Sequence, residues 1–216
     1  MPLPNRPTTG IIFDEHRSAS HSATDPWARV RSWRLRYVPV RATLIALLAV
    51  TLGAWITHRV IPTLPVRELT DAIRLHTAGE GTIAVWMRLF ASQSPLYILL
   101  FCAGMTRFSG ALTNGVLLVS GMIDGATLTL LWYAAGHGEA SVALLVAYLL
   151  RATTETALRV CLATAACRLA RCMDDRECGG EGNGLQTRLI VRYAATFSVV
   201  IIAVALVCLG YVVLAF

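Results

Sequence analysis

Residues 109–135 read SGALTNGVLLVSGMIDGATLTLLWYAA, and Asp124 is the only charged residue among them. A run of this length can cross a hydrocarbon core of about 30 Å as one α-helix. Backbone polar groups in lipid must be satisfied within the protein, and a helix satisfies them within one segment. The stretch therefore predicts a membrane-spanning helix whose single carboxylate needs a partner inside the protein.

The composition of the whole chain extends this prediction. Of 216 residues, 56% are hydrophobic and 15% charged, and the mean hydropathy is +0.60. This is too apolar for an ordinary soluble domain and too long for a single membrane anchor. We predict an all-α, polytopic helical membrane protein in contact with the lipid bilayer, with about five transmembrane helices. The expected spans are residues 38–58, 83–106, 109–135, 140–167 and 189–216.

The polar segments between and before these spans differ in character. Residues 1–37 are rich in Pro, Ser, Thr and Arg, which predicts a disordered basic cytoplasmic tail. Residues 38–216 are expected to form the transmembrane bundle. Within it, residues 59–82 contain VRELTDAIRLHTAGEG, which predicts an external amphipathic segment at the interface. Residues 168–188 are expected to form a cytoplasmic loop.

The arginines set the predicted orientation. All 19 basic residues other than histidine are Arg, and the formal net charge is +6. Thirteen of them fall on the side of the amino terminus and four on the opposite side, while two lie within a span. An excess of Arg marks the cytoplasmic side, so we place the amino terminus in the cytoplasm. Because the arginines flank apolar spans instead of forming one basic face, we expect no nucleic-acid partner.

A charged stripe occurs inside the fourth predicted span. Residues 148–160 read YLLRATTETALRV, so Arg151, Glu155 and Arg159 follow one another at four-residue intervals on one helix face. A hairpin turn at residues 136–139 would place Asp124 level with Arg151. We predict a buried cluster of Asp124, Arg151, Glu155 and Arg159, in which Asp124 pairs with Arg151.

The role of this cluster stays open at this point. Charges near the middle of a bilayer cost about 2.5 to 3.5 kcal/mol each on insertion scales, so mutual pairing would offset much of that cost. The cluster would then fix helix register and partner choice. A proton or ion relay is a second interpretation, and a charged intramembrane residue of another protein would be a third.

Glycines mark the predicted contacts between helices. Gly121 and Gly125 form a small-xxx-small step, and Gly104, Gly110 and Gly115 precede it. Small residues let helix backbones approach closely where lipid provides no hydrophobic driving force. A tightly packed bundle is one interpretation of this face, and an intermolecular face, including one between two copies of the chain, is the other.

Signatures of catalysis and of cofactor binding are missing from the sequence. Neither a GxSG serine-protease setting nor HExxH nor a P-loop occurs. Cys161, Cys167, Cys172 and Cys178 follow one another at five- or six-residue intervals, which is not the spacing of a zinc site. We expect no enzyme, no cofactor and no metal.

The order of these features resembles the stage II sporulation protein M family. Residues 97–128, YILLFCAGMTRFSGALTNGVLLVSGMIDGATL, are similar to that family's most recognisable region, with Gly104, Gly110, Gly121 and Gly125 at its glycine positions. Arg192 and Tyr193 open the last span as a similar pair does there. The sequence departs from the family in having Ala111 and Leu112 where a Pro is usual, and Ser120 where a basic residue is common.

The resemblance implies a function. It implies a non-enzymatic multi-pass scaffold in the bacterial cytoplasmic membrane, one that anchors membrane-bound peptidoglycan hydrolases during forespore engulfment. The alternative from another class is a small transporter or permease subunit that uses the charged cluster.

Overall fold

The computed structural model of the protein describes residues 37–60, 81–138, 140–177 and 183–215. Contacts divide the chain into Met1–Tyr37 and Val38–Phe216. Within the described ranges the second unit is built from helices with no strand, which confirms the all-α membrane fold. The predicted tail (except Tyr37) and most of the predicted external segment, residues 61–80, lie outside the described residues.

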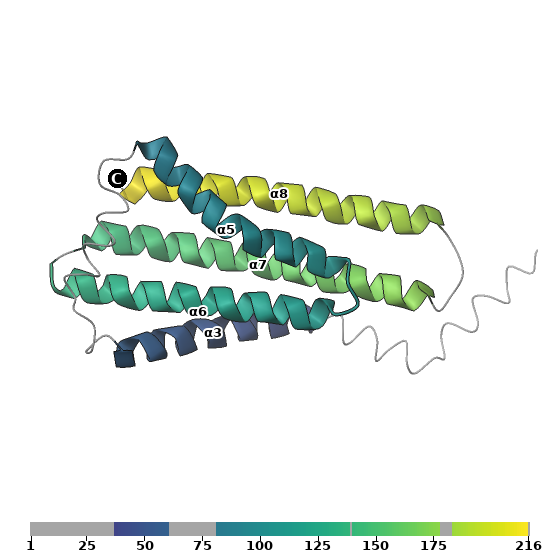
Figure 1. Ribbon diagram of the computed structural model, residues 1–216, viewed down its shortest axis with the longest axis horizontal. Coiled ribbons are helices and arrows are strands. Elements are labelled where there is room, and N and C mark those ends of the chain that lie inside the picture. The colour runs from purple at the N-terminus through teal and green to yellow at the C-terminus, as the bar shows by residue number, and fades with distance from the viewer. Residues whose placement is uncertain (1–36, 61–80, 139, 178–182, 216) are drawn as a thin grey trace, which may run out of the picture. The chain divides into compact units, whose positions relative to one another are not determined.

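Each predicted span corresponds to one helix in the structure (Figure 1). In chain order these are α3 (Val38–Val60), α5 (Thr82–Gly104), α6 (Ser109–Gly136), α7 (Val142–Glu177) and α8 (Asn183–Ala215). The prediction of a loop over residues 168–188 is wrong for most of its length. Helix α7 continues to Glu177 because RLARCMDDRE contains neither Gly nor Pro, and α8 has already begun at Asn183.

Four of the described helices are long and apolar enough to cross a membrane: α3, α5, α6 and the Thr187–Leu214 part of α8. Their outward-facing side chains include exposed Ile83, Trp132 and Val199, as expected for faces that contact lipid. Helix α7 is longer than any of them but less apolar, since its charged stripe interrupts the span predicted at 140–167.

Helix α7 contacts each of the other four helices and so forms the centre of the bundle (Figure 1). Its buried side chains pack with those of α5 and α8 into one core, which includes Leu100, Leu162, Ala166 and Val204. Helix α6 lies between α7 and α3 and contacts both. This arrangement surrounds the charged stripe of α7 with protein rather than lipid.

Polar contacts at two levels join α5 to α8. The Trp86 indole N–H donates to the Ala205 carbonyl at 2.9 Å, and the Tyr193 hydroxyl lies 3.0 Å from the Leu100 carbonyl. Pro95 lies between these two levels in the sequence, and Figure 1 shows α5 bent in its middle, as a proline inside a helix explains.

Candidate functional site

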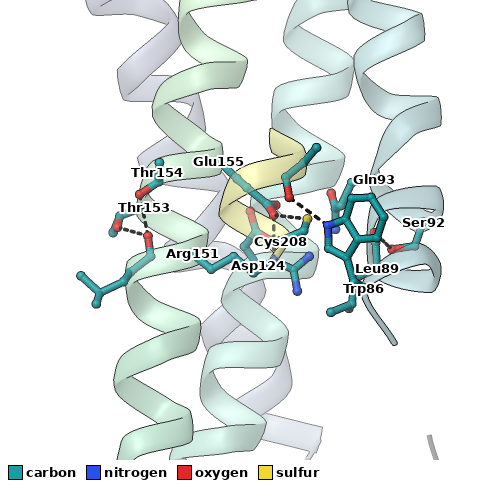
Figure 2. A network of polar contacts seen from close by, with 12 residues as sticks. Trp86, Leu89, Ser92, Gln93, Asp124, Arg151, Thr153, Thr154, Glu155 and Cys208 are labelled. Carbon is teal, nitrogen blue, oxygen red and sulfur yellow. Dashed lines mark hydrogen bonds and ion pairs between the residues drawn. The ribbon is translucent and has the colours of Figure 1, made fainter. Parts of the chain in front are cut away.

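The structure gathers the charged residues of α6 and α7 into one buried cluster (Figure 2). Exposed fractions are 1% for Glu155 and Arg159, 6% for Asp124 and 7% for Arg151. The α7 residues share one face because their spacing of four is close to one helical turn. That face points at α6, which supplies Asp124.

Three ion pairs hold the cluster together. Arg159 Nη1 lies 2.5 Å from Asp124 Oδ2, and its Nη2 lies 2.8 Å from Glu155 Oε2. Arg151 Nε donates to Glu155 Oε1 at 2.7 Å. Two guanidinium groups thus face two carboxylates, and Glu155 bridges both arginines. Formal charge balances within the cluster, which is the condition for burying ions at low cost.

The predicted partner of Asp124 was wrong: its ion pair is with Arg159, not with Arg151. The connection between Gly136 and Val142 is longer than the predicted turn, so the register of α6 against α7 differs from the one that the sequence predicted. Helical side chains also slant toward the amino terminus of their own helix. In antiparallel helices this brings the long Arg159 side chain back toward Asp124 and carries Arg151 away.

Neighbouring helices contribute polar groups that the sequence prediction did not include. From α5, the Gln93 side-chain carbonyl accepts a hydrogen bond from Arg159 Nη2 at 2.9 Å, and the Tyr97 ring lies 6.0 Å from the Arg159 guanidinium carbon. From α8, Cys208 Sγ lies 3.7 Å from Glu155 Oε1, and the Tyr211 ring lies 5.0 Å from the guanidinium carbon of Arg151. The cluster therefore connects α5, α6, α7 and α8.

A sequence signal for some of these groups existed. Gln93 and Tyr97 are four residues apart on α5, and Tyr211 follows Cys208 by three residues on α8. Such spacings put each pair on one helix face, as the stripe on α7 does. What sequence could not supply is which face of α5 and α8 turns toward α7.

One donor of the cluster has no hydrogen-bond partner among the described residues. Arg159 Nε is buried without one, although both terminal nitrogens of the same side chain are engaged. The guanidinium is held from two sides by carboxylates and from a third by Gln93. Its position is therefore set by its terminal nitrogens.

The predicted packing glycines divide into two groups. A Cβ on Gly121 would lie 2.7 Å from the Ala49 side chain, and one on Gly125 would overlap the Val50 carbonyl of α3. A Cβ on Gly104 would lie 2.6 Å from the Tyr193 hydroxyl. By contrast, a Cβ on Gly110 or Gly115 would meet nothing within 4 Å among the described residues, so these two glycines make no close helix contact there.

Small residues of α3 pack against the face of α6 that carries Gly121 and Gly125. Ala42, Ala46, Ala49 and Gly53 are the buried residues of α3 and lie on one face of it. A Cβ on Gly53 would in turn overlap the Met122 carbonyl. The face that carries Gly121 and Gly125 is thus covered by α3 of the same chain.

Within the described ranges, no group of three or more His, Cys, Asp or Glu side chains is arranged to hold a metal ion. Five cysteines of these ranges are free thiols, including Cys161, Cys167 and Cys172. Cys178, the fourth cysteine considered in the sequence, lies outside the described residues. Comparison with protein-family models, with curated proteins and with solved structures finds no match to this chain.

Proposed function

We propose that this chain is a non-enzymatic integral membrane scaffold that anchors membrane-bound peptidoglycan hydrolases in the bacterial cytoplasmic membrane. The observation that carries the proposal is the closed charged cluster, in which both carboxylates are bound by arginines and the bonds reach α5, α6, α7 and α8. Such a network fixes the relative positions of helices, which is what a platform for other proteins requires.

A transport site makes a different demand on the same residues. A carboxylate that carries protons or ions must exchange its partner during each cycle, and water must reach it. Here Glu155 is held by two arginines and Asp124 by the more deeply buried of them. Opening either pair would expose uncompensated charge in the bundle, so the geometry favours a fixed structural role.

The class of partner comes from the resemblance to the stage II sporulation protein M family. By the predicted orientation, the amino-terminal part of α5 faces the outside of the cell, next to the predicted external segment 59–82. Ile83 and Met87 are exposed there, at 75% and 55%, and offer apolar contact points close to the membrane surface. Residues 59–93 are therefore the region where we expect partners to bind.

Photo-crosslinking in the native host tests this proposal. A photoreactive residue is placed at Ile83 or Met87, and a matched control at Phe108, which is 77% exposed beyond the other end of α5. Cells are sampled during growth and starvation, and captured proteins are identified by mass spectrometry. Cell-wall hydrolases captured from residues 83 and 87 during starvation, but not from 108, are the expected result.

A transport ATPase captured instead, or no partner in either condition, would contradict the scaffold. If the protein conducts ions in proteoliposomes and Asp124→Asn abolishes that flux, the transporter interpretation would replace the scaffold proposal. The flux measurement must be made with a variant that still unfolds cooperatively, so that loss of flux is distinguished from loss of fold.

A further inference from the structure

An open cavity of about 480 Å³ lies between α7 and α8, near the beginning of α3. It is separate from the charged cluster, since none of the four cluster residues lines it. The lining residues come mainly from the carboxyl-terminal half of α7 and the first part of α8, and they include Pro39, Val160, Arg168, Leu169, Leu189 and Arg192.

The cavity has a positive and an apolar part. Arg168 of α7 and Arg192 of α8 are its charged lining residues and both are exposed, and no carboxylate lines it among the described side chains. Val160, Leu169 and Leu189 supply apolar wall. A site with two arginines on facing helices beside an apolar surface suits a phosphate group attached to hydrocarbon.

The depth of the cavity in the membrane matches such a ligand. Pro39 lies at the beginning of α3, and Arg192 lies near the start of the apolar Thr187–Leu214 stretch, so the cavity is at a membrane boundary. The arginine distribution predicts that this boundary faces the cytoplasm. Anionic phospholipids there attract basic residues, and basic sites between helices bind their headgroups.

We propose that this cavity binds the headgroup of an anionic phospholipid. Arg168 and Arg192 bind the phosphate from two sides, while the part of the acyl chains nearest to the headgroup lies along Val160, Leu169 and Leu189. One lipid then bridges α7 and α8 at the end of the bundle opposite to the Gly136–Val142 connection.

Lipid binding to the full chain tests the proposal. Purified protein is delipidated, titrated in detergent with phosphatidylglycerol or phosphatidylcholine, and examined by native mass spectrometry. The test variant is Arg168→Gln with Arg192→Gln. The matched control is Arg171→Gln with Arg188→Gln, because these two exposed arginines lie on the same helices near the same boundary but do not line the cavity.

We expect the unaltered chain and the control to prefer phosphatidylglycerol, and the test variant to bind it about tenfold or more weakly. Circular dichroism of both variants verifies that the helices remain. Equal loss in the two variants would show nonspecific surface charge and overturn the site, as would no loss in the test variant. A third titration uses inorganic phosphate. If phosphate binds the lipid-free protein and displaces the lipid at equal concentration, the ligand of the cavity is a soluble phosphate compound and not a lipid.

Discussion

Helix α6 is held on two sides by different means. On the side of α3, Gly121 and Gly125 bring two backbones into contact with almost no side chain between them. On the side of α7, Asp124 forms an ion pair with Arg159. Both contacts arise within five residues of sequence, 121–125. The comparison teaches that the chain uses both means by which helices associate in lipid, close packing and polar bonding, on adjacent faces of one helix.

The two contacts should fail in different ways. Removing one member of a buried ion network leaves an uncompensated charge, so its cost includes desolvation as well as the lost bond. Enlarging a glycine in a backbone contact forces the helices apart, and its cost depends on how far they can shift. Mutations on the two faces therefore measure different free energies, and the charged face should give the larger one.

The largest effect is expected for Arg159→Gln. This change removes two ion pairs and leaves Asp124 without its ionic partner, so it should lower the free energy of unfolding by about 3 kcal/mol or prevent folding. Unfolding by SDS titration in mixed micelles measures the change. Arg171→Gln is the control, because it removes an exposed arginine from the same helix.

A second variant keeps this prediction testable when the single change does not fold. Asp124→Asn with Arg159→Gln removes both charges of one pair and leaves Glu155 with Arg151. We expect the double variant to be more stable than Arg159→Gln alone, by roughly 1 kcal/mol or more. If the two changes add without coupling, the pair is not a structural contact and the comparison drawn above fails.

Gly125→Ala should have the next largest effect. Its Cβ would overlap the Val50 carbonyl, a backbone atom that can move only with α3, so we expect a loss of about 2 kcal/mol in the free energy of unfolding. Gly115→Ala is a matched control on the same helix, because a Cβ there meets no atom of the described residues within 4 Å. The control should be neutral or slightly stabilising through helix propensity. Equal effects at the two positions would show that α3 and α6 do not touch at Gly125.

The sequence predicted the elements of this fold better than their contacts. The length of an apolar stretch is a local property, and it located each described helix to within a few residues except where α7 and α8 extend into the expected loop. The partner of Asp124 depended on the length of one connection and on the slant of two side chains. Gly121 and Gly125 are four residues apart and contact α3, whereas Gly110 and Gly115 are five residues apart and lie outside that contact.

Arg151→Gln tests which of the two arginines contributes more to the stability of the charged cluster. Arg151 forms one ion pair and lies over the Tyr211 ring, but Glu155 keeps its second pair, with Arg159, when Arg151 is changed. The loss should therefore be smaller than for Arg159→Gln, about 1 to 2 kcal/mol in the same SDS titration. A larger loss than for Arg159→Gln would mean that Arg151, not Arg159, is the main counter-ion of the cluster.

The smallest effect is expected away from both faces of α6, at Tyr193→Phe. The Tyr193 hydroxyl donates to the Leu100 and Phe101 carbonyls, at 3.0 and 3.1 Å, while its ring stacks on Phe101. These carbonyls belong to a helix, so the hydroxyl adds a neutral bond to groups that α5 also engages. Losing it should cost about 1 kcal/mol in the SDS titration, with Tyr133→Phe as a partly exposed control. A cost equal to that of Arg159→Gln would show that neutral bonds between helices stabilise this bundle as strongly as buried charge does, and the difference between the two kinds of contact would disappear.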